Sequence, residues 1–306
     1  MQDLIIIGGG PAGVSAGVYA SRKKLKTILI AKDFGGQSIV SDSIENWIGD
    51  ISIPGPDLAK KFENHLMAYA GEDVQVVKGE FAQKVEKTES GFKVSTDKNT
   101  YEAKAVLITT GSHRRRLEAE NADMFEHKGI TYCASCDGPM FTGKDVVVIG
   151  GGNAGFESAA QLLAYTNSVT LLNRSNELKA DPVTVESVLK DPKMSLIKNA
   201  QILKIIGDKF VSGLIYKDAV TGEEKEIACQ GIFVEIGNIP TTEMVQGVVP
   251  LDEFNRIKID PWTQRTETDG IWAAGDCTNI IYHQNNIAAG DAVKALEDIF
   301  IWVKSK

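Results

Sequence analysis

The chain has 306 residues, of which 43% are hydrophobic and 24% are charged. This length predicts about two domains, and the composition excludes a disordered, collagen-like or coiled-coil protein. Lysine and arginine number 33 against 41 aspartate and glutamate, a net charge of −8 that argues against a broad nucleic-acid-binding or anionic-membrane-binding surface. Four cysteines are too few for a disulfide-stapled secreted scaffold.

The start of the chain carries neither the basic end nor the roughly 7–15-residue apolar stretch of a signal peptide. No run reaches the ~18–20 apolar residues of a membrane-spanning helix. We therefore expect a soluble, cytoplasmic protein with neither a nucleic acid nor a membrane as partner. In that reducing compartment, a close pair of cysteines performs chemistry or binds metal more often than it braces a fold.

The first predicted unit lies at the N-terminus. Residues 4–7 are an apolar run, residues 8–13 a glycine-rich turn, residues 14–21 a helix-compatible stretch and residues 27–30 a second apolar run. Continuous apolar runs of this length are typical of parallel strands buried on both faces. Strand, glycine turn, helix and strand together form a βαβ unit.

The same order recurs about 140 residues later. Here the strand is 146–149, the turn 150–155, the helix 156–165 and the next strand 169–172. Two separate units of this kind predict two dinucleotide-binding domains rather than a short repeat array.

The segments outside the two βαβ units are expected to form further strands, two linkers and a terminal helix. We expect antiparallel strands over 81–105 with a turn at 90–91, and further strands at 210–216 and 227–236 with a turn at 221–222. Linkers are expected at the basic stretch 113–116 and at 237–240. An amphipathic terminal helix is expected over 288–304.

Both glycine turns match G-x-G-x-x-G. In this pattern the first glycine makes the tight turn, the second lets the backbone approach a pyrophosphate, and the third lets helix and strand pack closely. The N-terminus of the following helix offers free N–H groups and a positive dipole end to the phosphates. A strand before the turn and a helix after it make the pattern specific, so we predict a nucleotide at each loop.

The residue that ends the second strand of each unit indicates which nucleotide binds. Asp33 follows the first unit's second strand and is a candidate ribose ligand. In the second unit no carboxylate stands there, and Arg174 and Lys179 are placed to meet a 2′-phosphate. This favours NADPH, with NADH left open, and with ordinary surface cations as the alternative interpretation of both side chains.

Cys133 and Cys136 form a C-x-x-C motif followed by Asp137. Such a pair is either a redox dithiol or half of a zinc site, and structural zinc normally takes four protein ligands. The sequence has no second C-x-x-C and only four histidines, so we expect a redox dithiol and no metal. In C-x-x-C motifs the pKa of the nucleophilic thiol commonly falls to about 7 or below, and Asp137 is a candidate proton carrier. Cys229 is expected to be a core residue, and Cys277 a small packing residue rather than a redox group, because no partner cysteine is nearby in sequence.

Together these motifs resemble the low-molecular-weight thioredoxin reductase family over essentially the whole chain, with detail closer to the reductase portion of the alkyl hydroperoxide reductase flavoprotein. We expect that protein's N-terminal thioredoxin-like domains to be a separate partner here. The motifs that carry the resemblance are Gly8-Gly9-Gly10-Pro11-Ala12-Gly13, Gly35-Gly36-Gln37, Glu45-Asn46-Trp47, Thr110-Gly111, Cys133-Ala134-Ser135-Cys136-Asp137-Gly138, the 150–155 loop with Glu157, and Ala273-Ala274-Gly275-Asp276-Cys277.

The resemblance implies an α/β fold of two Rossmann-like domains. An NAD(P)H-binding domain over 116–241, which carries the dithiol, is inserted into an FAD-binding domain made of 1–115 and 242–306. Linkers near 112–117 and 237–241 would let one domain rotate against the other. The implied cofactor contacts are Gly8, Gly10, Pro11, Ala12, Gly13, Gly36, Gln37, Asn46, Thr110, Gly111, Gly275, Asp276, His283 and Gln284 for FAD, and Gly150, Gly152, Asn153, Ala154, Gly155, Arg174 and Lys179 for the nicotinamide nucleotide.

The resemblance also implies an activity. NADPH reduces FAD, the flavin reduces the Cys133–Cys136 disulfide through Cys136, Cys133 attacks the disulfide of a thioredoxin- or glutaredoxin-like protein, and Asp137 moves protons. Homodimers are usual in the family. The chain departs from the family's NADPH-type pattern after the second strand, where Asn173 and Ser175 flank the one arginine. Two alternatives therefore stay open: a dithiol oxidase or reductase with a donor such as ferredoxin, and a non-catalytic FAD-holding redox sensor.

Overall fold

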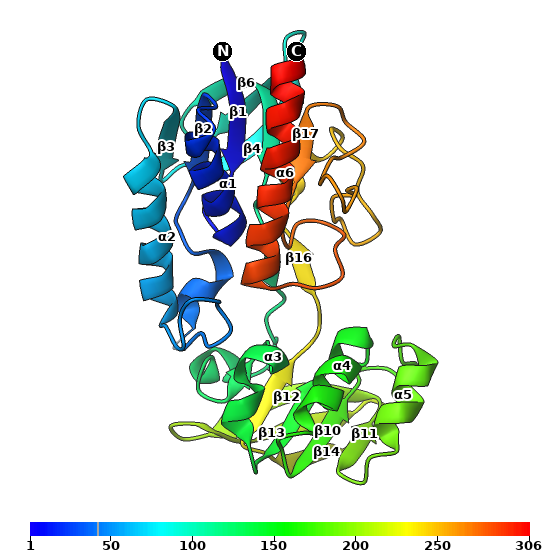
Figure 1. Ribbon diagram of the computed structural model, residues 1–306. Helices are drawn as coiled ribbons and strands as arrows, with labels where there is room; N and C mark the ends of the chain where they lie inside the picture. Colours follow the sequence, from blue (N-terminus) through cyan, green and yellow to red (C-terminus); the bar gives the residue numbers. More distant parts are fainter. Residues whose placement is uncertain (42) are drawn as a thin grey trace. The chain divides into compact units, whose positions relative to one another are not determined.

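The computed structural model describes residues 1–41 and 43–306 (Figure 1). The chain forms two compact units, one made of Met1–His113 with Ile239–Lys306 and the other of Arg114–Asn238. The chain passes between them twice, near the two stretches predicted as linkers. In these passages two short strands, β7 (Ser112–Arg114) and β16 (Asn238–Pro240), pair with each other.

The first unit contains a sheet of order β3-β2-β1-β6-β5-β4, with β17 also paired to β6. Its first three elements, β1 (Gln2–Ile7), α1 (Pro11–Arg22) and β2 (Thr27–Ala31), confirm the predicted N-terminal βαβ unit, with β1 parallel to both β2 and β6. The other elements of this unit are η1 (Gly36–Val40), α2 (Gly55–Tyr69), β3 (Val74–Lys78), β4 (Ala82–Lys87), β5 (Phe92–Thr96), β6 (Thr100–Ile108), η4 (Glu243–Val245), β17 (Ile271–Ala273) and α6 (Asn285–Ser305).

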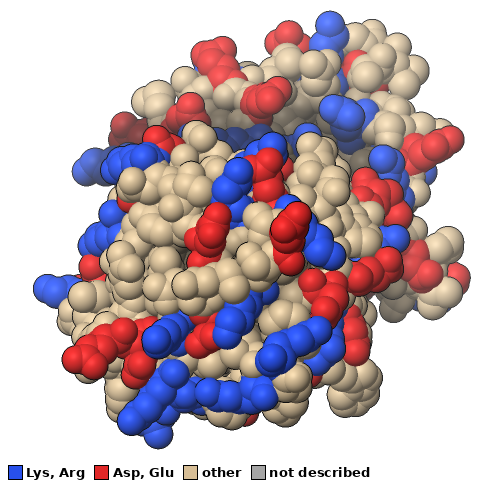
Figure 2. Space-filling view, turned by 90° about the horizontal axis from the view of Figure 1, so that it is seen from above, with Lys and Arg blue, Asp and Glu red and all other residues tan. Residues whose placement is uncertain are grey.

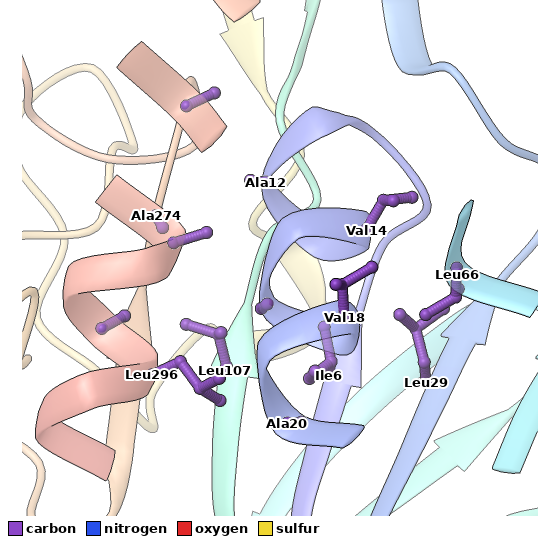
Figure 3. Close-up of a cluster of buried hydrophobic side chains, with 14 of the residues drawn as sticks. Ile6, Ala12, Val14, Val18, Ala20, Leu29, Leu66, Leu107, Ala274 and Leu296 are labelled. Atoms are coloured by element: carbon purple, nitrogen blue, oxygen red, sulfur yellow. The ribbon is translucent and has the colours of Figure 1, made fainter. Parts of the chain in front are cut away.

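Helix α1 packs at the centre of this unit's core. Its apolar face, with Val14 and Val18, turns toward Leu29 of β2 and Leu66 of α2, and Leu296 of α6 lies on its other side (Figure 3). The approach is close at Gly17, where an added Cβ would lie 2.7 Å from Leu66 Cδ1. The absence of a side chain at Gly17 thus lets Leu29 and Leu66 pack directly against the backbone of α1.

The antiparallel part of the prediction is confirmed by β4, β5 and β6, which pair in that order. The predicted turn at 90–91 connects β4 to β5. The terminal helix is also present, as α6, and begins three residues earlier than the hydrophobic pattern indicates.

The second unit contains a parallel sheet of order β11-β10-β9-β15-β8 and an antiparallel sheet of order β12-β13-β14. Its second βαβ unit, β9 (Asp145–Ile149), α4 (Asn153–Leu162) and β10 (Ser168–Leu172), confirms the predicted repeat. The other elements are η2 (Ala122–Phe125), β8 (Ile130–Thr131), α3 (Ala134–Asp137), η3 (Gly138–Phe141), α5 (Pro182–Leu189), β11 (Met194–Ile197), β12 (Ala200–Gly207), β13 (Val211–Asp218), β14 (Glu224–Ala228) and β15 (Gly231–Val234).

Two predicted boundaries in this unit differ from the structure. Helix α4 spans Asn153–Leu162 rather than 156–165, because the helix begins within the glycine-rich segment, directly after Gly152, and the chain past Leu162 turns back toward β10. The apolar stretch 227–236 holds two strands of different sheets. They separate at Gln230, whose N–H donates to Asp145 O at the start of β9.

No helix in the described parts of the chain, 1–41 and 43–306, combines the length and apolar character needed to cross a membrane. Acidic and basic side chains are interspersed over the face that Figure 2 displays.

Candidate functional site

The first unit has a cleft of about 470 Å³ at the carboxyl ends of β1, β2 and β6. This is the edge of a parallel sheet at which dinucleotides bind. Ten of the predicted FAD contacts line the cleft, namely Gly8, Gly10, Pro11, Ala12, Gly36, Gln37, Thr110, Gly111, Gly275 and Asp276. Asp33 lines it as well.

The first glycine loop has the geometry that its sequence pattern requires. Gly8 has φ +123°, and a Cβ there would lie 2.3 Å from Thr109 O. A Cβ on Gly13 would lie 1.9 Å from Gly8 O, so Gly13 packs helix against strand behind the cleft rather than lining it. A Cβ on Gly10, by contrast, would meet only Gly36 Cα, at 3.9 Å. The backbone at Gly10 is thus open to the cleft, and this concave surface at the N-terminus of α1 fits the pyrophosphate of FAD.

Besides Gly13, three predicted contacts lie outside the lining of the cleft, namely Asn46, His283 and Gln284. Asn46 Nδ2 donates to Gln284 Oε1 at 3.2 Å, which brings two of them together. His283 Nδ1 lies 3.5 Å from Asp276 Oδ1 and is buried without a hydrogen-bond partner among the described residues. His283 is therefore linked to the cleft through Asp276.

The second glycine loop repeats the first. Gly150 has φ +131°, and its Cβ would lie 2.2 Å from Glu235 O. A Cβ on Gly155 would lie 1.9 Å from Gly150 O, whereas a Cβ on Gly152 would meet nothing within 4 Å. The close contacts fall where strand and helix pack, and the open position falls at the N-terminus of α4. This loop therefore fits a second pyrophosphate.

Asn173 directly follows β10, and its side chain holds the loop beside the glycine turn. Its side-chain amide donates to Ser175 O at 2.8 Å and to Glu177 O at 2.7 Å. The N–H of Lys179 in turn donates to Gly151 O at 2.9 Å. Arg174 and Lys179 are exposed, and within residues 1–41 and 43–306 neither side chain has a hydrogen bond or an ion pair. Both cations are thus available to a ligand at the loop.

Cys133 and Cys136 are joined by a disulfide, with their Cα atoms 5.3 Å apart. Cys133 caps the N-terminus of α3, and its Sγ accepts a hydrogen bond from the N–H of Cys136 at 3.1 Å. Asp137 accepts a hydrogen bond from Thr131 Oγ1. An N–H donor stabilises a thiolate more than a thiol, and here the Cys136 N–H is directed at the sulfur of Cys133.

Tyr132, the residue directly before Cys133, has contacts that the C-x-x-C motif does not specify. Tyr132 donates to Glu126, and burial together with this hydrogen bond raises the pKa of the Tyr132 hydroxyl. The guanidinium of Arg114 lies 5.6 Å from the centre of the Tyr132 ring. Tyr132 precedes the motif directly, Glu126 lies six residues before it, and Arg114 belongs to β7.

Glu235 is another residue that the sequence did not reveal. Its Oε1 accepts a hydrogen bond from Ser158 Oγ at 2.6 Å. Partial burial of the Glu235 carboxyl raises its pKa to about 7. The one sequence feature that could have identified Glu235 is its position as a carboxylate directly after the buried strand β15.

The remaining cysteines lie in the core, as predicted. Burial raises the pKa of the Cys229 thiol to about 12 and that of the Cys277 thiol to about 11, so both stay protonated at neutral pH. Trp47 is half-buried and packs edge-on against Phe62, with ring centroids 5.1 Å apart.

Comparison with known proteins places these features in a family context. Residues 2–292 match the family model described as pyridine nucleotide-disulphide oxidoreductase. The "NADH dehydrogenase" of Bacillus subtilis is 40% identical over 294 residues, and an alkyl hydroperoxide reductase component of Staphylococcus epidermidis is 37% identical over 302 residues. The alignments cover 96% and 98% of this chain, but only 57% and 59% of those proteins. The chain thus spans little more than half the length of these curated relatives.

Among solved structures, thioredoxin reductase from Streptococcus pyogenes is 32% identical, with a TM-score of 0.91. That comparison covers 100% of this chain and 99% of the other.

Proposed function

The chain belongs to the pyridine nucleotide-disulphide oxidoreductase family, and from that premise we propose that it is a reductase that passes electrons from NADPH through FAD and the Cys133–Cys136 pair to the disulfide of a thioredoxin-like protein. Members of this family are oxidoreductases that use FAD and NAD(P)H, and the fold is that of thioredoxin reductases. The overall reaction balances as NADPH, a proton and a protein disulfide giving NADP⁺ and a protein dithiol.

The observation that carries the proposal is the presence of three parts in one chain. The first glycine loop opens into a cleft, the second has the same open position at a helix N-terminus, and the second unit carries a disulfide-bonded C-x-x-C. A redox sensor needs only the first and third parts, and a dithiol oxidase needs no second loop. The complete set therefore favours the reductase.

Each part has a proposed role. The cleft of Met1–His113 with Ile239–Lys306 binds FAD, which accepts hydride from a nicotinamide and delivers two electrons to a disulfide. Asp276, on the cleft wall, is placed to hold a hydroxyl of the bound cofactor. The loop at Gly150–Gly155 and α4 holds the nucleotide pyrophosphate, and Arg174 with Lys179 holds the 2′-phosphate.

The dithiol residues have distinct proposed roles. Cys133, whose sulfur accepts the N–H of Cys136, is the thiolate that attacks the substrate disulfide. Cys136, the more exposed of the two, receives electrons from the flavin. Asp137, hydrogen-bonded to Thr131, carries the proton.

The acceptor and the assembly belong to the same proposal. A thioredoxin- or glutaredoxin-like protein is the proposed acceptor, because the similar solved structures are thioredoxin reductases and Cys136 is exposed, and thiol–disulfide exchange requires access to the attacking pair. The homodimer remains part of the proposal, and so does a thiol-reducing compartment such as the cytoplasm.

The test is disulfide-reductase turnover by the FAD-loaded chain with NADPH and a thioredoxin disulfide. Cys133→Ser and Cys136→Ser should each abolish turnover while the nucleotide still bleaches the flavin. The matched control is Cys229→Ala, a buried cysteine of the same unit, which should retain turnover. Full turnover by Cys133→Ser would refute the assignment. Bleaching of the flavin by dithionite but by neither nucleotide would instead support another electron donor.

A further inference from the structure

Glu235 lies at the point of the second unit's sheet where ligands bind. It is the first residue after β15, which pairs with β9, while β10 pairs with the opposite side of β9. The strand order therefore reverses between β9 and β15. In open α/β sheets, a ligand occupies the crevice outside the carboxyl ends of the strands at such a reversal.

The contacts of Glu235 connect it to both sides of this crevice. Its carbonyl oxygen would lie 2.2 Å from a Cβ on Gly150, so its backbone is in contact with the first glycine of the loop. Its carboxyl accepts from Ser158 of α4, the helix whose N-terminus the loop precedes. The carboxyl thus contacts α4, the helix that presents its N-terminus at the loop.

Charged groups of opposite sign act on this carboxyl. Arg114 of β7 favours its ionised form, and so does the hydrogen bond from Ser158. Glu157 of α4 opposes ionisation, as does partial burial, which has the largest effect. The balance leaves the carboxyl able to change its charge near neutral pH.

We propose that Glu235 makes nucleotide binding proton-linked: the nicotinamide dinucleotide binds the form of the second unit in which the Glu235 carboxyl is neutral. This inference rests on the proposed function, because it takes the Gly150 loop to be the nicotinamide nucleotide site. It adds a residue whose charge determines the affinity of that site.

The physical reason is repulsion between like charges. A dinucleotide brings two negative phosphates to the loop, and an ionised carboxyl beside the loop weakens their attraction to the helix N-terminus. Bound phosphates in turn raise the pKa of the carboxyl further, so binding takes up a proton. Affinity then falls as pH rises above neutrality, by at most about tenfold per pH unit for one proton.

The test uses NAD⁺ as probe, because it does not reduce the flavin and lacks the 2′-phosphate, whose own pKa is near ~6. Isothermal titration calorimetry of the FAD-loaded full chain from pH 6 to 8.5, in two buffers of different protonation enthalpy, measures both Kd and protons taken up. We expect Kd to rise on the order of tenfold between pH 6.5 and 8.5, with a fraction of a proton taken up near pH 7.

Two variants separate this role from a structural one. Glu235→Gln keeps the shape and should bind with a Kd nearly independent of pH and with no proton uptake. Ser158→Ala removes a hydrogen bond that favours the carboxylate, so the pH at which affinity falls should move upward. Glu224→Gln, an exposed carboxylate on β14 of the same unit, is the control and should keep the wild-type pH dependence.

Three results would overturn the inference. One is a wild-type Kd for NAD⁺ that does not change with pH, and another is a pH dependence of that Kd that is the same in Glu235→Gln as in the wild type. The third is affinity that increases with pH, which would mean that the carboxylate accepts a hydrogen bond from the nucleotide. If neither NAD⁺ nor NADP⁺ binds at any pH, both the inference and the proposed function fail, whereas pH-independent binding removes the inference alone.

Discussion

The exposed cations beside the second glycine loop give the account its most specific prediction. Arg174 and Lys179 have no side-chain partner among the described residues, and the Lys179 backbone is held against the loop by its hydrogen bond to Gly151 O. An exposed, charge-assisted contact to a phosphate contributes about 1–1.5 kcal/mol. The double variant Arg174→Ala with Lys179→Ala should therefore weaken NADPH binding by ~2–3 kcal/mol, or roughly 30-fold to 160-fold.

The assay is anaerobic stopped-flow reduction of the flavin over a range of NADPH and NADH concentrations. The loss should appear in the concentration of NADPH needed for half-maximal rate, while the corresponding value for NADH changes by less than about twofold, because NADH lacks the phosphate. Lys190→Ala, at the end of α5, is the control for a lost surface cation. An equal loss for both nucleotides would refute the assignment, and so would no loss for NADPH.

Three further predictions concern the dithiol and Glu235. In the reduced protein, iodoacetamide should alkylate Cys133 faster than Cys136, and the pH at which the Cys133 rate reaches half its maximum should lie below the ordinary thiol pKa of ~8.5. Peptide mass spectrometry measures both rates, and equal rates would contradict this expectation. Asp137→Asn should slow dithiol transfer to the acceptor by about 10²-fold and leave flavin reduction by nucleotide unchanged, whereas an unaltered transfer rate in rapid-mixing experiments would exclude a proton role. Because the pKa of Glu235 is raised to about 7 in the folded protein, ionisation reduces stability as pH rises from the ordinary glutamate range through 7. Glu235→Gln should thus raise the free energy of unfolding by ~1–2 kcal/mol at pH 8 and by nothing near pH 4, and identical urea midpoints at both pH values would contradict the burial argument.

The parts of the fold that the sequence predicts are those governed by local pattern. The two βαβ units follow from apolar runs and glycine spacing, because the glycines at 8 and 150 occupy backbone conformations that other residues rarely adopt. The apolar pattern misplaces the start of α4, since the first turn of this helix contains Asn153 and Gly155. The apolar pattern also predicts one continuous strand over 227–236, because hydrophobicity alone does not show that β14 and β15 belong to different sheets.

The candidate site also has a part that the sequence predicts and a part that only the folded structure reveals. The glycine loops and the cysteine pair are contiguous motifs, so their spacing carries the information. Glu235, Ser158 and Arg114 are far apart in sequence, and only the strand order places the carboxyl of Glu235 at the reversal between β9 and β15. The hydrogen bond between Cys136 N–H and Cys133 Sγ likewise depends on the backbone of α3, which the motif alone does not specify.

The central claim is that the flavin and the Cys133–Cys136 disulfide lie on one electron path. Anaerobic titration of the FAD-loaded chain with NADPH counts the electrons that the protein accepts. We expect about two equivalents of NADPH per flavin, one for FAD and one for the disulfide, falling to about one in the Cys133→Ser, Cys136→Ser double variant. One equivalent in both proteins would contradict the account, because the disulfide would then receive no electrons from the nucleotide.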